Sequence, residues 1–459
     1  MQKVKFLHTI FVLRKQDQAG IYYNFIKQIL LGITFFFIIA TYSVIRPLKT
    51  AVFLGMVGKE FVPIAKIVSI IILFPCLIFY ARLVDKLKRY QVMCFFLFFY
   101  VVALLITSII LLHPTIGLSN SETNQYRIFG WIFYLLIDLF SPLVVATFWA
   151  FSNSINNPED AKTNYGRIVA FSRIGGIFST FFCWLIIKKT SFSFVYTIPA
   201  MLICISVFLV CATFCITRII KKIPKEFLRG YEAVYLAEKN RKKEQGGLWS
   251  GLKFIITQPY VFGIFGIVYI YEVISILTDY QMQVLMSIQA KNMISDMTAF
   301  MFMYTMSFQL VGLFFAFFGT GWLLKKIGVS LSLFIMPISI IIFMFILFNF
   351  PSLNIIFVIM VLLRALNYGF NAPVKEILYI PTIREIKFKS KAWIDSLGKS
   401  LSKTSGSTFS FIAYTNNYLR LIRMNSIIVL LFSFIWIFIV FGLGKKYTKT
   451  IKCDQVIGR

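Results

Sequence analysis

Long apolar segments dominate the pattern of this 459-residue chain from Phe25 to Gly444. Each is rich in Phe, Ile and Leu and is separated from the next by a short polar stretch. A helix of ~20 apolar residues crosses ~30 Å of hydrocarbon with every backbone hydrogen bond made within its own segment. The pattern therefore predicts an all-α, polytopic membrane protein.

The apolar pattern predicts twelve transmembrane helices. They are expected at residues 25–45, 62–81, 91–113, 129–152, 167–188, 194–217, 258–279, 298–324, 329–350, 353–373, 404–419 and 424–444.

The longest polar stretch, at residues 218–250, separates six predicted helices from six. Major-facilitator transporters are built from two six-helix halves, and such folds hold substrate near the middle of the bilayer. We therefore expect an N-terminal six-helix bundle at 1–217, a basic cytoplasmic linker at 218–250 and a C-terminal six-helix bundle at 251–459. A segment that only tethers the two halves would have the same composition.

Composition supports the membrane class and explains the charge. Hydrophobic residues make up 59% of the chain and charged residues 14%, whereas about a quarter of the residues of soluble domains are charged. The net charge of +29 would suggest nucleic acid in a soluble protein, but Lys and Arg gather between the predicted helices. Since cytoplasmic loops carry excess Lys and Arg, we expect both termini in the cytoplasm and no nucleic-acid partner.

Residue types that carry chemistry elsewhere are sparse here. The seven cysteines form no CxxC pair, which predicts neither a disulfide framework nor a zinc site. The two histidines, His8 and His113, have no metal-ligand or catalytic spacing, so we expect no cofactor and no enzyme activity. A channel is disfavoured because no repeated selectivity-filter string is present.

Basic residues at membrane depth suggest an anion site. Arg46 and Lys49 close the first predicted helix, and Pro47 between them would break or kink it. Lys66 lies near the start of the second predicted helix. A charge in hydrocarbon costs several kcal/mol, so such residues usually face a cavity or a partner. The alternative is that Arg46 and Lys49 extend to the lipid headgroups.

Two acidic residues, Asp138 and Asp279, also fall within or at the end of predicted helices. They could repel surplus anion, pair with the lysines between transport steps, or take up a proton, and the sequence does not decide among these. Placement by chance at a helix end accounts for Asp279 almost as well.

A polar string from residue 364 to 407 ends in Lys403, Thr404, Ser405, Gly406 and Ser407. Small residues beside a lysine at a helix start suit phosphate, because backbone N–H groups, the helix dipole and the ammonium all favour an anion. No GxxxxGK[ST] motif is present in the string, so ATP hydrolysis is not implied.

Several strings resemble the ATP/ADP translocase family of intracellular bacteria, plastids and microsporidia. They are RPLKTAVF, IAKIVSIIILFP, FWAFSNSINNPEDAKTNYG, NYGFNAPVKEILYIP, KSKAWIDSLGKSLSKTSGS and FIWIFIVFGLGKKY. The resemblance covers nearly the whole chain and implies an exchanger of ATP for ADP, or a proton-coupled importer of other nucleotides or phosphorylated metabolites. It also implies a location in the cell membrane of an intracellular bacterium.

The same resemblance assigns roles to residues. The family's basic residues fall on Lys49 and Lys403, and its acidic residues on Asp138 and Asp279, with Asp in place of Glu. Lys49, Lys66 and Lys403 would be phosphate ligands supported by Arg46, with Ser405 in the small-residue string. Transport of another solute, such as a peptide, remains an alternative, and the oligomeric state is left open.

Overall fold

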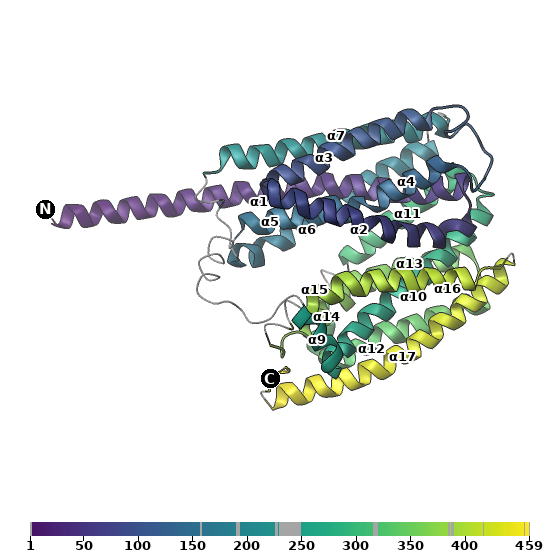
Figure 1. Cartoon of the computed structure of the whole chain (residues 1–459). Helices are drawn as coiled ribbons and strands as arrows, with labels where there is room; N and C mark the ends of the chain where they lie inside the picture. Colours follow the sequence, from purple (N-terminus) through teal and green to yellow (C-terminus); the bar gives the residue numbers. More distant parts are fainter. Residues whose placement is uncertain are drawn as a thin grey trace. The chain divides into compact units, whose positions relative to one another are not determined.

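The protein, in a computed structural model, is described at residues 2–156, 158–189, 193–224, 228, 249–314, 320–383, 386, 390–415, 417–453 and 455–458. Helices form nearly all of these residues (Figure 1). The longer helices are α1 (Gln2–Met56), α2 (Val62–Lys86), α3 (Arg89–Leu111), α4 (Ile128–Asp138), α5 (Ala146–Ile155), α6 (Pro158–Lys189), α7 (Phe194–Lys222), α9 (Trp249–Thr257), α10 (Pro259–Gln289), α11 (Ile294–Phe314), α12 (Thr320–Asn349), α13 (Leu353–Leu366), α16 (Lys399–Ile412) and α17 (Tyr418–Lys452). Short helical elements are the 3₁₀ turn η1 (Lys59–Phe61), the π turns η2 (Ser141–Val145), η5 (Asn367–Asn371) and η7 (Ile394–Gly398), and α14 (Ala372–Ile377) and α15 (Lys391–Trp393).

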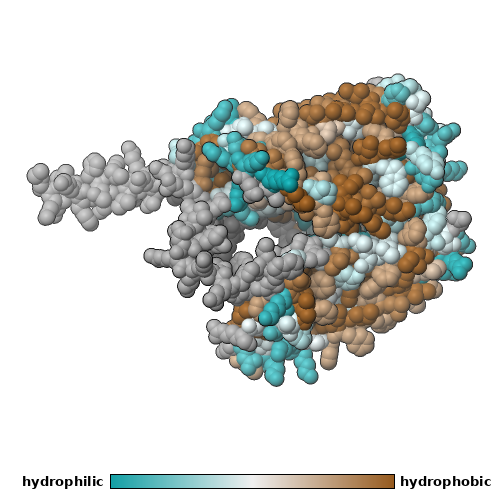
Figure 2. Space-filling model, viewed as in Figure 1, coloured by the Kyte–Doolittle hydropathy of each residue, from teal (hydrophilic) through white to brown (hydrophobic). Residues whose placement is uncertain are grey.

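Ten helical segments of the described residues are long and apolar enough to cross a membrane. The apolar helix α13 and the more polar α16 have 14 residues each and fall short of that length. The protein is therefore an integral multi-pass membrane protein, whereas the expected count of twelve is not confirmed. Figure 2 shows hydrophobic residues over the middle of the visible helices and hydrophilic residues toward the helix ends.

The chain folds into two compact units. Unit 1 comprises Met1–Leu48, Pro75–Asn120 and Leu136–Glu244, and unit 2 comprises Lys49–Phe74, Ser121–Leu135 and Gln245–Arg459. Helices α1, α2 and α4 thus contribute residues to both units. Most of the expected linker at 218–250 lies outside the described residues, so the division into bundles at 1–217 and 251–459 stays a prediction.

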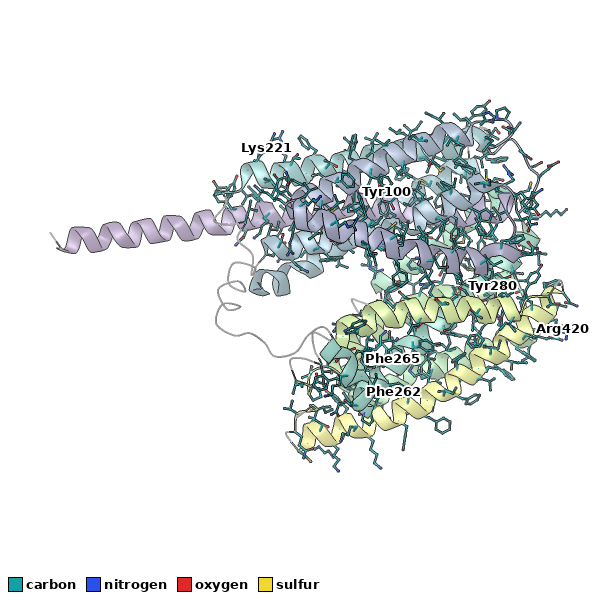
Figure 3. The ribbon with its side chains drawn as sticks, viewed as in Figure 1. Tyr100, Lys221, Phe262, Phe265, Tyr280 and Arg420 are labelled. Carbon is teal, nitrogen blue, oxygen red and sulfur yellow. The ribbon has the colours of Figure 1, made fainter. Side chains whose placement is uncertain are left out.

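Within unit 1, hydroxyl groups donate hydrogen bonds to backbone carbonyls of neighbouring helices. Ser179 of α6 donates to the carbonyl of Ala40 on α1 at 3.0 Å, and Ser108 of α3 donates to that of Pro199 on α7 at 3.0 Å. Tyr100, labelled in Figure 3 and fully buried, donates to the carbonyl of Leu136 at 3.0 Å. Small and hydroxyl side chains pack membrane helices closely and satisfy polar groups away from water.

Unit 2 is organised around α10, which packs against α16 and α17. At Gly406 of α16, a Cβ atom would lie 3.1 Å from Cβ of Ile276 on α10, so glycine permits this close approach. Gln281 of α10 donates from Nε2 to the carbonyl of Ile422 on α17 at 2.9 Å. Tyr280, also labelled in Figure 3, is fully buried next to it. These contacts therefore fix the position of α10 against α16 and α17, near the charged residues described below.

Two helices extend well beyond the apolar segments that predict them. Helix α1 continues through Pro47 to Met56, so the expected break does not occur, and α10 continues to Gln289 rather than ending near residue 279. A buried neighbourhood sustains these extensions: α1 residues 51–56 have little exposure, and so does most of α10 after Asp279. Hydropathy identifies the part of a helix that is apolar enough to lie in the hydrocarbon region, whereas packing decides where the helix ends.

The boundary between the eighth and ninth predicted helices lies partly outside the described residues. Helix α11 is described as far as Phe314, and α12 is described from Thr320. Gly328 within α12 has a φ of 73°, a left-handed conformation that glycine adopts without a steric penalty. This kink at Gly328 lies between the expected end of the eighth helix at 324 and the expected start of the ninth at 329, and both bounds stay predictions.

Candidate functional site

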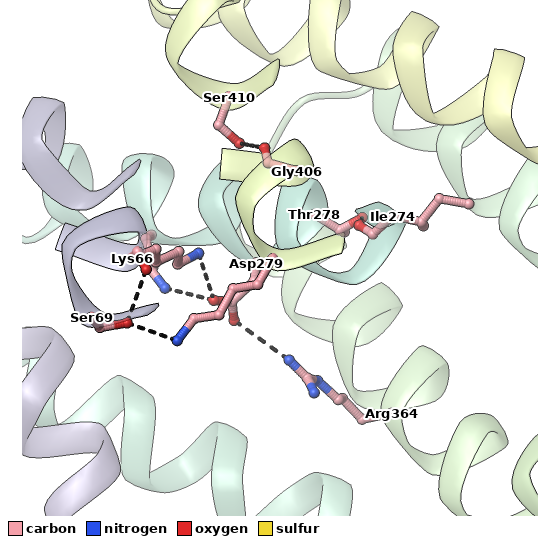
Figure 4. Close-up of polar contacts among 10 residues, drawn as sticks. Lys66, Ser69, Ile274, Thr278, Asp279, Arg364, Gly406 and Ser410 are labelled. Carbon is pink, nitrogen blue, oxygen red and sulfur yellow. Dashed lines mark hydrogen bonds and ion pairs between the residues drawn. The ribbon is translucent and has the colours of Figure 1, made fainter. Parts of the chain in front are cut away.

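Asp279 on α10 receives polar side chains from its own helix and from α2 and α13 (Figure 4). Its Oδ2 accepts a 2.7 Å hydrogen bond from Nε2 of Gln283 and lies 3.5 Å from Nζ of Lys66 on α2. Its Oδ1 lies 3.9 Å from Nη2 of Arg364 on α13. The side chains of Lys66, Asp279 and Arg364 are 9%, 16% and 13% exposed. We use the name Asp279 cluster for a group of six residues: Lys66, Ser69, Asp279, Gln283, Arg364 and Lys403.

The position of Asp279 in its helix differs from the expectation. Ten residues of α10 follow it, which is about 15 Å of helix at 1.5 Å per residue. Asp279 therefore lies inside the helix, and placement by chance at a helix end no longer accounts for it. A carboxylate at such a position requires a cation or a proton.

Lys403 joins the cluster through Ser69. Its Nζ donates to Oγ of Ser69 at 2.9 Å, and the same hydroxyl donates to the carbonyl of Lys66 at 2.9 Å. Ser69 and Lys66 are three residues apart on α2, so they share one face of that helix. Lys403 is three residues before Gly406, which lies against Ile276 of α10, so Lys403 shares the face of α16 that packs on α10.

The expected helix start at Lys403 is wrong. The helical backbone begins at Lys391 in α15 and continues through η7 into α16, which places Lys403 in a helix interior. Two glycines of this string, Gly398 and Gly406, instead lie against Phe265 and Ile276 of α10. Lys403 therefore offers its ammonium group without a helix N-terminus beside it.

Lys49 lies on the part of α1 that belongs to unit 2. Its Nζ is 4.4 Å from the ring centroid of Tyr134 on α4, which is a cation–π contact. One turn further along α1, Phe53 packs against Tyr134 and Trp131, with ring centroids 4.8 Å and 5.3 Å away. Lys49 is thus seven residues from the end of α1 and lies over the buried ring of Tyr134.

Positive charge is in excess at this place. Lys49 and Lys403 both act electrostatically on Lys66, and Asp279 opposes them. Among the described residues, the cluster and its neighbour Lys49 bring four cationic side chains to one carboxylate. Such a set favours an anion with several negative oxygens, because charge-assisted hydrogen bonds to phosphate or carboxylate are about twice as strong as neutral ones.

Comparison with known sequences identifies the kind of protein that carries this cluster. The sequence matches the profile of the family described as TLC ATP/ADP transporter over residues 19–447. The chain belongs to this family. The resemblance expected from the motifs is thereby confirmed.

Individual relatives in the TLC family cover nearly all of the chain. It is 24% identical over 484 residues to ADP,ATP carrier protein 1 of Rickettsia prowazekii, with 94% of this chain and 95% of the relative covered. It is 22% identical over 485 residues to ADP,ATP carrier protein 3 of Rickettsia typhi, with 90% and 93% covered. The similarity of this TLC-family chain therefore extends over nearly the full length of both relatives.

Solved transporters share the fold of the TLC-family chain. A bacterial homologue of the iron transporter ferroportin, inward-facing, has a TM-score of 0.64 at 12% identity, with 90% of this chain and 98% of that chain covered. A mutant of the nucleoside transporter NupG has a TM-score of 0.61 at 13% identity, with 91% and 99% covered. These likenesses show a helical transporter fold and carry no information on the substrate.

Two residues expected at the site, Arg46 and Asp138, lie in unit 1. Asp138 is the last residue of α4, and the π turn η2 follows it three residues later. It acts electrostatically on Tyr100, the buried tyrosine that bonds Leu136. Asp138 therefore lies where the fourth membrane segment changes from α-helical to π-helical geometry, which is often a functional position.

Ser405 lies apart from the Asp279 cluster. Its hydroxyl accepts a 2.7 Å hydrogen bond from Tyr269 of α10 and donates to the carbonyl of Leu401 at 2.9 Å. Tyr269 is ten residues before Asp279 on the same helix, about 15 Å away. Because positions two apart on a helix face different directions, Ser405 and Lys403 lie on different faces of α16, and a role of Ser405 in substrate binding stays a prediction.

Sequence reasoning missed three members of the cluster. Arg364 is a charged residue within the apolar run of α13, so the criterion that selected Asp138 would have selected it too. Ser69 and Gln283 are neutral, and such residues are frequent in membrane helices without any special role. Only the three-dimensional arrangement identifies those two.

Proposed function

We propose that this TLC-family protein transports nucleotides and exchanges ATP for ADP across the membrane by alternating access. The observation that carries the proposal is the excess of positive charge around Asp279 within unit 2. Family membership and the names of the Rickettsia relatives support a nucleotide as the anion. A nucleoside triphosphate offers a chain of anionic oxygens long enough to reach several ammonium groups at once.

In the proposed cycle the phosphates replace Asp279 as the partner of Lys66. Lys49, Lys66 and Lys403 are the proposed phosphate ligands, and the supporting role of Arg46 remains what the family resemblance implies. Without substrate, Asp279 satisfies Lys66, whose ammonium lies 3.5 Å away. A ligand shifts a conformational equilibrium only by its differential affinity for the two states, so exchange requires that the loaded site crosses more readily than the empty one.

The proposal includes an architecture and an orientation. The N-terminal bundle spans 1–217, the cytoplasmic linker 218–250 and the C-terminal bundle 251–459, and both termini lie in the cytoplasm of an intracellular bacterium whose inner membrane holds the protein. Excess Lys and Arg in the cytoplasmic segments supports this orientation. A reporter that is active only outside the cytoplasm, fused after Lys446, is expected to be inactive.

Uptake in intact bacteria tests the proposed function. Cells that express the chain are given labelled ATP, ADP, GTP, UTP or NAD, with and without an unlabelled internal nucleotide pool. Labelled ATP or ADP is expected to enter, and the internal pool is expected to accelerate entry. Uptake that the internal pool does not accelerate would indicate an importer rather than an exchanger, and no uptake above cells with an empty vector would overturn the proposal.

A further inference from the structure

We infer that unit 2 binds one anionic phospholipid of the bilayer in a cavity between α10 and α17, with the lipid phosphate at Lys446 and an acyl chain over Gly442. The cavity shares no residue with the Asp279 cluster. The inference goes beyond the proposed function, because it concerns the lipid that the protein holds and not the solute that it carries.

The cavity lies where α10 begins and α17 ends, and its volume is about 870 Å³. Ligand sites in proteins commonly have volumes of roughly 300 to 1,000 Å³. Phe438, Gly442, Lys446 and Thr450 of α17 line the cavity at intervals of four residues, so they share one face of that helix. The twelve residues from Phe438 to Thr450 correspond to about 18 Å of helix. The cavity is thus a long groove beside α17.

Hydrogen bonds hold the two walls that face α17. Tyr260 of α10 is buried, and its hydroxyl donates to the carbonyl of Leu378 at 2.8 Å. Ile457, which follows α17, is also buried and donates from its backbone N–H to the carbonyl of Pro381 at 2.8 Å. The carbonyl of Ile457 accepts from the N–H of Ile383 at 3.1 Å. The walls of the cavity therefore belong to the folded structure of unit 2.

Gly442 creates space in the apolar part of the cavity. A Cβ atom at Gly442 would meet no other atom within 4 Å. Phe438, one turn earlier on α17, and Phe262 of α10, labelled in Figure 3, are exposed and line the same cavity. Water gains nothing by covering such a surface, whereas a hydrocarbon chain removes the apolar area from water. This part of the cavity suits an acyl chain.

The part of the cavity toward the end of α17 is polar and positive. Lys446 is exposed one turn after Gly442, and Gln258, Thr450 and Gln455 line the cavity with it. No acidic side chain is among the lining residues in the described part of the chain. A zwitterionic headgroup would bring an ammonium group to this positive site, whereas an anionic headgroup brings a phosphate that an ammonium binds well. Basic pockets between membrane helices bind anionic lipid headgroups in this way.

The order of the lining residues favours a lipid over a soluble phosphate compound. Along α17 the aromatic ring comes first, then the gap at Gly442, and then the lysine and the hydroxyl toward the helix end. Chain and headgroup of a phospholipid follow one another in the same order from the bilayer middle to its surface. A soluble phosphate compound would use only the polar part.

The first experiment measures lipid binding to the purified full-length protein by native mass spectrometry. Phosphatidylglycerol and phosphatidylcholine with identical acyl chains are titrated separately. The wild type is expected to bind one phosphatidylglycerol about ten-fold more tightly than phosphatidylcholine. Lys446→Gln is expected to abolish this preference and Lys446→Arg to keep it. Lys445→Gln is the matched control, because it removes the same charge from the neighbouring exposed residue, which does not line the cavity.

The second experiment tests the acyl chain. Gly442→Leu places a side chain in the open space and is expected to weaken binding of both lipids roughly ten-fold. Its unfolding midpoint in lipid-free detergent is expected to stay at or above that of the wild type, because leucine favours a helix more than glycine does. Glycerol phosphate, the headgroup without chains, is expected not to displace phosphatidylglycerol at equal concentration.

Four results would overturn the inference. They are equal binding of the two lipids by the wild type, a preference for phosphatidylglycerol that survives Lys446→Gln, unchanged lipid affinity in Gly442→Leu, and displacement of the lipid by glycerol phosphate. The last result would indicate a site for a soluble phosphate compound instead. Transport enters none of these measurements, so failure of the proposed function would leave their outcome unaffected.

Discussion

Two buried lysines of this TLC-family protein, Lys27 and Lys66, have opposite surroundings. Lys27 in unit 1 is 1% exposed, and its Nζ donates at 3.1 Å to the carbonyl of Ile155, the last residue of α5. Beside it, Nε2 of Gln28 donates to Oδ1 of Asn156 at 2.8 Å. Lys66 in unit 2 is 7% exposed and shares one carboxylate with an arginine.

The difference separates a structural lysine from a candidate ligand. A cation at a helix C-terminus is stabilised by carbonyl groups that no substrate replaces, so Lys27 fixes α1 against α5. Lys66 depends on a partner that is itself shared, and two further lysines act on it. Burial alone therefore does not mark a binding residue, whereas an excess of cations over carboxylates in one place does.

The largest expected effect comes from Asp279→Asn, which keeps the shape of the side chain and removes its charge. Loss of one partner of a buried ion pair costs about 3 to 5 kcal/mol, because the remaining charges stay buried. The unfolding midpoint of the purified protein is expected to fall sharply, and added ATP is expected to restore part of the loss. Asp296→Asn, an exposed acid at the start of α11, is the control. Unchanged stability would mean that Lys66 does not depend on the charge of Asp279, and the proposed difference between Lys66 and Lys27 would then be wrong.

The next effect is expected from Lys27→Met, which fills the same space without an ammonium group. The free energy of unfolding is expected to fall by about 3 kcal/mol, since a charged hydrogen bond and a cation at a helix C-terminus are both lost. Uptake per folded molecule is expected to stay at the wild-type level. Lys86→Met, at the exposed end of α2, serves as the control. Loss of uptake with stability intact would break the comparison.

Lys403→Gln is expected to affect substrate rather than stability. Removal of one charge-assisted hydrogen bond to phosphate, worth about 2 kcal/mol, weakens ATP binding roughly ten-fold or more. The unfolding midpoint is expected to change little. Lys399→Gln is the matched control, because that lysine lies one turn earlier on α16, is 52% exposed and pairs with Asp395 at 3.7 Å. Equal effects of the two substitutions would remove Lys403 from the proposed ligands.

Sequence alone predicted the helical membrane fold and selected Lys66 and Asp279, because a charge in an apolar run is costly enough to be informative. Arg364 carried the same information. Helix ends were predicted less well, since packing sustains α10 beyond Asp279 where hydropathy declines. No sequence pattern indicates that Ser69 bonds Lys403, because that contact joins residues 334 positions apart.

The smallest effect is expected from Ser69→Ala, which removes the hydroxyl that accepts from Lys403 at 2.9 Å. If phosphate replaces this hydroxyl as the partner of Lys403, the serine competes with substrate in the empty site. Its loss is then expected to tighten ATP binding by up to about five-fold, equivalent to ~1 kcal/mol. Ser410→Ala is the control, because that hydroxyl bonds the carbonyl of Gly406 within its own helix at 2.9 Å. A weakening as large as that of Lys403→Gln would instead show that Ser69 aims the lysine at the phosphate, and the exchange of partners proposed for Lys66 would then not extend to Lys403.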